Sequence, residues 1–234
     1  MKQRTQVAII GAGPAGLVIS HLLHLQGIES VVIERRSRHF VENRLRAGML
    51  EQRTVDLLVD TGVGERLKRE AMVHSGVNFQ FEGERHRIPL DELTPGRNVT
   101  IYGQQEVVKD LIAARLAAGG ILHFEAEVLS IQGLDGKLAT VSYRQDGEVR
   151  EVEADYVAGC DGFHGICRGV VPAQNVYEKV YPFAWLGILA AVPPSCEELI
   201  YSRHERGFAL HTMRTPNSRA CTCSAPSTTR WKTG

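Results

Sequence analysis

The stretch TQVAIIGAGPAGLVISHLLHLQGIESVVIE, residues 5–34, predicts a strand, a glycine-rich turn, a helix and a second strand in direct succession. The apolar run Val7–Ile10 stops at Gly11, and leucines then recur at helical spacing until Gly27. Ser30–Ile33 is rich in β-branched residues, which is typical of a strand buried on both faces. These elements predict a Rossmann-like unit, and therefore an α/β fold.

The glycines of this turn have separate physical tasks. Gly11 makes the tight turn, Gly13 lets the backbone approach a pyrophosphate, and Gly16 lets the helix pack closely on the strand. The free N–H groups at the start of the helix would face that pyrophosphate. Glu34 lies about 20 residues after Gly13, where a carboxylate can accept hydrogen bonds from a ribose. A merely tight turn is the alternative, but the strand, helix and distant acid favour a dinucleotide site.

Composition excludes several function classes. The 234 residues suffice for one large domain or two small ones, and 27 Lys and Arg balance 27 Asp and Glu, so no overall field favours nucleic acid or an anionic membrane. A Gly-Ala-Gly-Pro breaker interrupts the apolar start, which argues against a secretion signal, and no other stretch approaches a membrane span. The five cysteines lack metal-site spacing, so we expect no metal ion, reduced thiols and a cytoplasmic protein.

A basic segment follows Glu34. Its members are Arg35, Arg36, Arg38, Arg44 and Arg46. Phosphates are their natural partners, and a solvated basic surface is the alternative. Arg46 differs because it has apolar and small neighbours just before a helix expected at Met49–Val59, where a buried charge would need an anion.

The middle of the chain combines hairpins with one long helix. The expected elements are a hairpin of Val77–Phe81 and Arg87–Leu90, a helix over Gln105–Ala117, and strands at Ile121–Phe124, Glu127–Gln132, Ala139–Arg144 and Tyr156–Gly159. Asp135-Gly136 and Asp146-Gly147 mark hairpin turns between these strands. An antiparallel excursion that returns to an apolar strand predicts a sheet of mixed topology.

A second motif, AGCDGFHG at residues 158–165, follows the returning strand. Glycines on both sides of Asp161 allow close approach to a phosphorylated ligand. A strand-terminal turn capped by Asp161 is an equally good explanation. His164 could contact a cofactor beside this turn, or it could be an ordinary polar loop residue.

The order of several blocks carries a family resemblance. The blocks are GAGPAG with Glu34, RLRAGMLEQ at 44–52, YGQQEV at 102–107, AGCDGFHG at 158–165 and YPFAWLGILA at 181–190. With them, the chain resembles the group A flavoprotein aromatic hydroxylases, and most of all the branch that acts on 4-hydroxybenzoate, from about residue 5 to about residue 214. The resemblance implies FAD and NADPH as cofactors and the hydroxylation of 4-hydroxybenzoate to 3,4-dihydroxybenzoate with O2. It also implies a Rossmann-like FAD/NAD(P)-binding domain, an antiparallel β-sheet substrate domain and a homodimeric full-length parent.

The resemblance assigns cofactor residues by position. Those that would bind FAD are Gly11, Gly13, Gly16 and Glu34 for its ADP part, and Arg46 and Gln104 for the rest. The turn Asp161-Gly162 matches a fingerprint shared by FAD and nicotinamide phosphates, and His164 would contact the NADPH pyrophosphate. Arg35, with the basic residues that follow it, matches the region that selects NADPH over NADH.

Substrate residues are implied in a hairpin of 199–201 and 206–210. Tyr201 resembles the tyrosine that deprotonates the substrate phenol, Thr212 stands where the family usually has a serine, and Arg214 resembles the arginine that binds the substrate carboxylate. The chemistry agrees, because a tyrosine within hydrogen-bond reach can accept the phenol proton and a planar guanidinium can bind a carboxylate with two parallel bonds.

The resemblance stops near Asn217. Residues 221–234, CTCSAPSTTRWKTG, indicate no packed element. The family continues with a run like YLQCPLDDKVEDW, and one permitted coding of that run, translated one base later, yields residues 222–234 in full. We therefore expect three parts. The FAD-binding domain would comprise 1–74 and 96–175, and the partial substrate domain would comprise 75–95 and 176–216. An out-of-frame tail would follow at 217–234. Weak FAD retention and aggregation would follow from such a truncation.

Two other functions are the alternatives. An FAD-binding oxidoreductase of another substrate class, such as a flavin reductase or a disulfide-type oxidoreductase, would usually show a second GxGxxG and a redox cysteine pair, and neither appears in this sequence. The other possibility is an inactive flavin-binding remnant.

Overall fold

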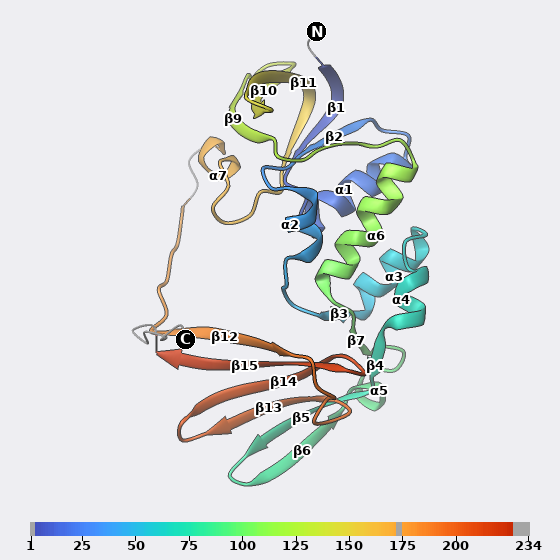
Figure 1. The fold of residues 1–234 in the computed structure, drawn as a ribbon, viewed down its shortest axis with the longest axis vertical. Coiled ribbons are helices and arrows are strands. Elements are labelled where there is room, and N and C mark those ends of the chain that lie inside the picture. Colours follow the sequence, from blue (N-terminus) through green and yellow to red (C-terminus); the bar gives the residue numbers. More distant parts are fainter. Residues whose placement is uncertain (1–2, 172–174, 227–234) are drawn as a thin grey trace. The chain divides into compact units, whose positions relative to one another are not determined.

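The computed structural model describes residues 3–171 and 175–226, which divide into two compact units. The first is drawn from 1–47, 60–63 and 104–175, and the second from 48–59, 64–103 and 176–234 (Figure 1). The stretches 48–59, 64–74 and 96–103, which we expected in the FAD-binding domain, cluster with the second unit.

A mixed sheet forms the first unit, in the strand order β8-β2-β1-β11-β10-β9. Its strands are β1 (Gln3–Ile10), β2 (Ser30–Ile33), β8 (Ile121–His123), β9 (Glu127–Gln132), β10 (Ala139–Gln145) and β11 (Glu148–Gly159). The neighbours β8, β2, β1 and β11 run parallel to one another. β10 pairs antiparallel with β11 on one side and with β9 on the other. Asp146 and Gly147 have φ angles of 53° and 80°, which a tight hairpin turn requires. The expected mixed topology is confirmed.

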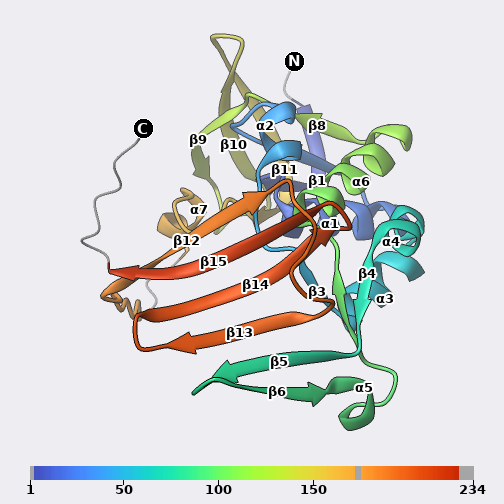
Figure 2. The ribbon, with the colours of Figure 1, turned by 60° about the horizontal axis from the view of Figure 1, so that its bottom comes forward.

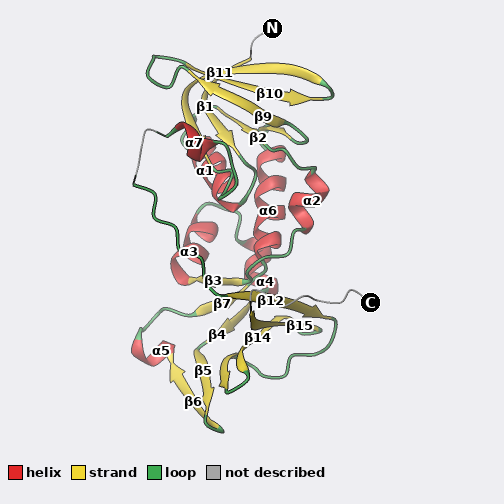
Figure 3. Ribbon diagram, turned by 90° about the vertical axis from the view of Figure 1, so that its left-hand side faces the viewer, coloured by secondary structure: helices red, strands yellow, loops and turns green. Residues whose placement is uncertain are grey.

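Helices pack beside this sheet (Figure 3). They are α1 (Pro14–Leu25), α2 (Arg38–Asn43), α6 (Gln104–Ala117) and the short α7 (Cys167–Val170). The long helices α1 and α6 lie against each other, and α2 contacts α6. Ile10, Val31, Ile33 and Val141 belong to the buried core of the sheet. Full burial of each such side chain stabilises the fold by about 1.5–3 kcal/mol, so this core holds the ends of β1 and β2 in place.

The second unit contains another six-stranded sheet, in the order β12-β15-β14-β13-β5-β6 (Figure 2). Its strands are β5 (Gly76–Phe81), β6 (Glu84–Pro89), β12 (Phe183–Ala190), β13 (Leu199–His204), β14 (Gly207–Thr215) and β15 (Ser218–Pro226). All neighbours are antiparallel except β13 and β5, which run parallel. The unit also contains β3 (Met49–Glu51), β4 (Met72–His74), β7 (Val99–Ile101), α3 (Gln52–Asp60), α4 (Glu65–Glu70) and α5 (Leu90–Leu93).

Two expectations were wrong. The helix expected from Met49 begins only at Gln52, because Met49–Glu51 is extended and pairs with β7. Residues 221–226 are not unstructured, because they belong to β15, which pairs with β12 on one side and β14 on the other. Backbone hydrogen bonds hold a central strand without requiring apolar alternation along it. Residues 227–234 lie outside the described part of the chain.

No helix in the described part of the chain is both long and apolar enough to cross a membrane.

Candidate functional site

The glycine-rich turn lies where the parallel strands β1, β2 and β11 end, since Ile10 pairs with Ile33 on one side and Gly159 on the other. Gly11 donates its N–H to the Ile33 carbonyl at 2.8 Å, and Cys160 donates to the Ile10 carbonyl at 2.8 Å. Gly11 has φ 104°, and a Cβ there would lie 2.5 Å from the Cys160 carbonyl oxygen. Only glycine therefore fits at this position, as the motif predicts.

The two other glycines of the motif meet different surroundings. A Cβ on Gly16 would overlap the carbonyl oxygen of Gly11, so helix α1 approaches the turn as closely as a backbone permits. A Cβ on Gly13 would meet nothing within 4 Å. Gly13 is the N-cap residue of α1, and no side chain caps this helix. The N–H groups of the first helical turn therefore point toward the free space beside Gly13. This arrangement fits a phosphate group.

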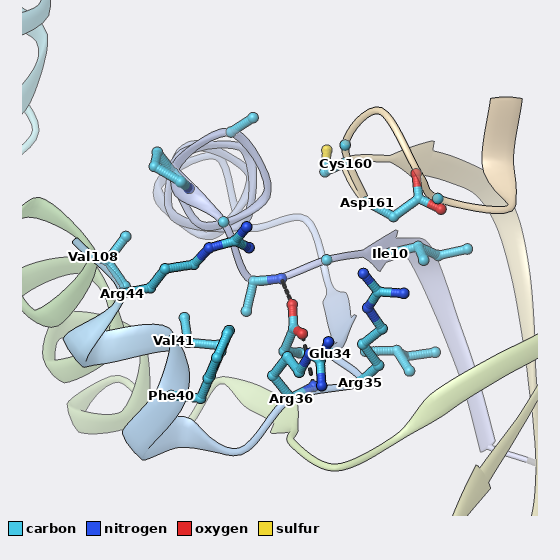
Figure 4. A pocket seen from close by; sticks show the side chains of 18 of the residues that line it. Ile10, Glu34, Arg35, Arg36, Phe40, Val41, Arg44, Val108, Cys160 and Asp161 are labelled. Carbon is cyan, nitrogen blue, oxygen red and sulfur yellow. Dashed lines mark hydrogen bonds between the residues drawn. The ribbon is translucent and has the colours of Figure 1, made fainter. Parts of the chain in front are cut away.

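Glu34 is held in place by backbone donors. Its Oε2 accepts the N–H of Ala12 at 2.8 Å and its Oε1 accepts the N–H of Arg36 at 2.8 Å (Figure 4). A carboxylate has about four lone-pair sites, so capacity remains for further donors such as sugar hydroxyls. The end of β2 therefore presents a fixed acceptor beside the glycine-rich turn.

A cavity of about 330 Å³ opens along this turn. This volume lies at the lower end of the range for small-molecule sites. The predicted site residues that line it are Gly11, Gly13, Glu34, Arg35, Arg46, Gln104, Asp161, Gly162 and His164. Gly16 lies outside the lining and acts through packing alone. The structure thus brings the predicted cofactor residues together around one cavity.

Arg44 also lines the cavity, although the sequence marked it only as part of a basic run. Partial burial, followed by the nearby charges of Arg46 and Arg36, lowers the pKa of Arg44. The guanidinium groups of Arg36 and Arg44 lie over the Phe40 ring, at 5.1 and 5.7 Å from its centroid (Figure 4). Converging positive charges raise each other's electrostatic energy, and an anion in the cavity would lower it.

The second motif has a local structural role in addition to its place at the cavity. Asp161 accepts the Cys167 N–H at 3.0 Å, so its carboxylate fixes the start of α7. Gly162 has φ 75°, which favours glycine. The His164 ring meets the Phe163 ring edge-on, with centroids 5.0 Å apart. The turn capped by Asp161 is therefore real, and the same turn forms one wall of the cavity.

In the second unit, Tyr201 lies on an aromatic sheet face. Its ring stacks on Phe79 with centroids 5.2 Å apart and lies 6.3 Å from Phe208, which meets Trp185 at 5.3 Å. Sequence reasoning missed these three aromatic residues, because they come from separate strands that only the sheet places side by side. Thr212 Oγ1 donates to the Ala220 carbonyl at 3.4 Å.

Arg214 is half-buried and packs against Gly48. Burial lowers the pKa of its guanidinium. A Cβ on the buried Gly48 would overlap Arg214 Nη1, and the Gly48 carbonyl accepts the Tyr102 N–H at 2.9 Å. The glycine of the RLRAGMLEQ block therefore provides the space that this guanidinium occupies.

The chain is similar in sequence to a known domain family and to two monooxygenases. The model of the family described as FAD binding domain matches residues 4–233. The p-hydroxybenzoate hydroxylase of Acinetobacter baylyi is 48% identical over 213 residues, which are 90% of this chain and 52% of that protein. A 12-dehydrotetracycline 5-monooxygenase/anhydrotetracycline 6-monooxygenase of Streptomyces rimosus is 33% identical, over 68% of this chain and 31% of its own. The chain thus spans about half the length of the first of these relatives and less of the second.

Solved structures show the same fold. The p-nitrophenol 4-monooxygenase PnpA of Pseudomonas putida superposes with a TM-score of 0.87 at 16% identity, over 98% of this chain and 60% of that one. PqsL of Pseudomonas aeruginosa, a probable FAD-dependent monooxygenase, has a TM-score of 0.83 at 20% identity, over 96% and 61% of the two chains.

Proposed function

The chain belongs to the FAD-binding-domain family, its relatives are flavoprotein monooxygenases, and from this lineage we propose that its full-length parent hydroxylates 4-hydroxybenzoate to 3,4-dihydroxybenzoate. The observation that carries this substrate is the 48% identity with p-hydroxybenzoate hydroxylase. FAD, NADPH and O2 are the proposed co-reactants. We place the enzyme in the cytoplasm and expect the parent to be a homodimer.

The cavity of the first unit is the proposed FAD site. The free space at Gly13 and the start of α1 would receive the pyrophosphate, and Glu34 would accept the ribose hydroxyls. Arg46 and Gln104 line the same cavity and would contact the remainder of the cofactor. When bound, FAD would supply the redox and oxygen-activating chemistry.

The basic residues beside this cavity are the proposed NADPH determinants. Arg35 and Arg36 place two positive charges at its rim, where a 2′-phosphate would be favoured over a hydroxyl. His164 and the Asp161-Gly162 turn would contact the dinucleotide phosphates. Preference for NADPH over NADH is therefore part of the proposal.

Three residues of the second unit are proposed to handle the aromatic acid. Tyr201 Oη would take part in removing the phenol proton, which increases the nucleophilicity of the adjacent ring carbon. Arg214 would bind the carboxylate with two parallel hydrogen bonds and so orient the ring. Thr212 would supply a further hydroxyl near that carboxylate.

FAD binding is the first test, because it needs only the chain itself. We expect titration with FAD to quench flavin fluorescence. Glu34→Ala should weaken binding by at least about tenfold, since one lost charge-assisted hydrogen bond is worth about 1.5–3 kcal/mol. Glu29→Ala is the matched control, because Glu29 is exposed and does not line the cavity. Equal affinities of the two variants would contradict the proposed ribose contact.

Turnover is the second test, and it uses the full-length parent. 4-Hydroxybenzoate should stimulate NADPH oxidation and yield 3,4-dihydroxybenzoate. Tyr201→Phe should lower kcat and alter its pH profile, whereas Arg214→Gln should chiefly raise KM. NADPH oxidation that does not respond to 4-hydroxybenzoate would refute the proposed substrate.

A flavin-binding remnant without turnover is the second candidate for the 234-residue chain. The observation that favours it is that the residues proposed to bind FAD line one cavity within the first unit. Such a chain would bind FAD yet show no NADPH oxidation with any aromatic acid.

A further inference from the structure

Two cysteines lie side by side on strand β15. Cys221 and Cys223 are alternate residues of this strand, so both side chains project from the same face of the sheet. Their Sγ atoms are 3.5 Å apart, and both side chains are half-buried. Neither cysteine forms a disulfide. The pair is therefore a pre-assembled dithiol that solvent can reach.

This dithiol lies on the face opposite Tyr201. Tyr201 pairs with Leu210 across β13 and β14, and Leu210 pairs with Thr222 across β14 and β15. Directly paired residues share a face, so Thr222 lies on the Tyr201 face and its neighbours Cys221 and Cys223 on the other. The dithiol is thus separate from the proposed substrate residues.

The strand geometry opposes a disulfide between these sulfurs. Alternate residues of a strand are about 6.6–6.8 Å apart, and their parallel Cβ atoms keep nearly that spacing. A disulfide needs Cβ atoms about 3.5–4.5 Å apart, so the backbone would have to bend. Bending would break hydrogen bonds to β12 and β14, which hold β15 on both sides. An atom that bridges the sulfurs requires no such movement.

We propose that Cys221 and Cys223 form a binding site for trivalent, monosubstituted arsenicals. In the reaction, an arsenoxide R–As=O condenses with the two thiols, two As–S bonds form, the As–O bond breaks, and the oxygen leaves as water with both thiol protons. Arsenic stays trivalent, so no oxidant or reductant is consumed. A single arsenic atom then bridges the two sulfurs.

The surroundings of the pair favour this ligand over a metal ion. The described residues contain no group of three or more histidine, cysteine or acidic side chains that could hold a metal, whereas structural zinc needs four ligands. His211 and Ile188 lie opposite Cys221, and Ala209 and Leu186 lie opposite Cys223. Burial and the hydrogen bond with Cys223 raise the pKa of the Cys221 thiol.

Phenylarsine oxide provides the test on the folded 234-residue chain. Intact-mass spectrometry should show one phenylarsenic group per chain, and two of the five cysteines should lose reactivity toward a thiol reagent. An excess of 2,3-dimercaptopropanol should reverse both changes. Cys221→Ser and Cys223→Ser should each lower the affinity at least tenfold, whereas Cys196→Ser, a matched cysteine of the same unit, should not.

Comparison with the chain in urea separates geometry from sequence proximity. The folded chain should bind more tightly than the unfolded chain, because the strand pre-assembles the pair. An adduct that persists when both cysteines are replaced, or one that forms only in urea, would overturn the proposal. The proposed FAD site lies in the first unit, so arsenical binding does not depend on it. The result of this test is therefore independent of the proposed function.

Discussion

Gly13 and Gly16 belong to one motif but respond to different constraints. Gly16→Ala should destabilise the fold by roughly 3 kcal/mol, because the new Cβ would overlap the Gly11 carbonyl oxygen. Gly13→Ala should change stability by less than about 1 kcal/mol, because a Cβ there meets nothing within 4 Å and φ is −74°. Urea denaturation of both variants measures the difference.

The Gly13→Ala and Gly16→Ala variants also distinguish an effect on folding from an effect on cofactor binding. Gly13→Ala should weaken FAD binding although the protein stays folded, because its methyl group would occupy space assigned to the pyrophosphate. Similar stability losses in the two variants would contradict the described packing, and unchanged FAD affinity in Gly13→Ala would contradict the proposed pyrophosphate position.

His74 makes stability depend on pH. It is 2% exposed, its Nε2 lies 2.9 Å from Met213 Sδ, and its Nδ1 has no hydrogen-bond partner. Burial lowers its pKa below the ordinary value of 6.5. As pH falls below 6.5, the unfolded chain binds a proton at this residue more readily than the folded chain does, so stability should fall until the pH passes the lowered pKa. Above pH 6.5 this contribution is constant.

Urea midpoints between pH 8 and pH 5 measure this effect. His74→Leu should flatten the pH dependence, whereas replacement of the exposed His204 by leucine should leave it in place. An equally steep loss of stability in His74→Leu would show that other groups cause it. His123 is one such group, since burial lowers its pKa as well.

At the level of elements, β15 decides whether the second sheet is continuous. Thr222 pairs with Gly187 on β12 and Leu210 on β14. Thr222→Pro removes a backbone donor from a central strand and should destabilise the second unit by about 3 kcal/mol or more. Amide hydrogen exchange should show the loss of protection in β12, β14 and β15.

A proline in a neighbouring turn is the matched control. Glu205 follows β13 in the turn to β14 and does not have a positive φ, so Glu205→Pro should be tolerated. If Thr222→Pro lowered stability no more than Glu205→Pro, β15 would not be part of the sheet in solution. That result would favour the expected unstructured tail.

At the scale of the whole molecule, the described part of the chain exposes several large apolar side chains. Tyr177 and Val180 are each 87% exposed, Tyr156 is 73% exposed and Trp185 is 54% exposed. Exposed apolar groups of this size promote self-association. We expect concentration-dependent light scattering from the isolated chain, which Tyr177→Lys combined with Val180→Lys should reduce. A monodisperse monomer at all concentrations would contradict this.

The reading frame of residues 217–234 is a separate question for the whole molecule. We propose that a one-base shift near codons 217–221 replaced the family's continuation. Resequencing the DNA across codons 210–240 should reveal a long open frame once one base is removed. An unbroken frame with unrelated codons would refute the proposal. Residues 218–226 would then be native sequence that forms the strand β15.

The sequence by itself determined the strand–turn–helix–strand unit, the mixed first sheet, and the glycines and the acid at the glycine-rich turn. This was possible because the constraints are local: glycines at fixed spacing, a proline at the helix start and an acid at a strand end. The roles assigned to Tyr201, Thr212 and Arg214 came from family resemblance, and they stay predictions.

Only the tertiary structure decided the features that depend on distant segments. Residues 49–51 became a strand because β7 offers a pairing edge, and 218–226 became β15 because β12 and β14 lie on either side of it. The contact of Gly48 with Arg214 and the aromatic face around Tyr201 likewise join residues far apart in the chain. Backbone pairing and close packing between such segments leave no periodic trace in the sequence, so their physical cause becomes visible only when the chain is folded.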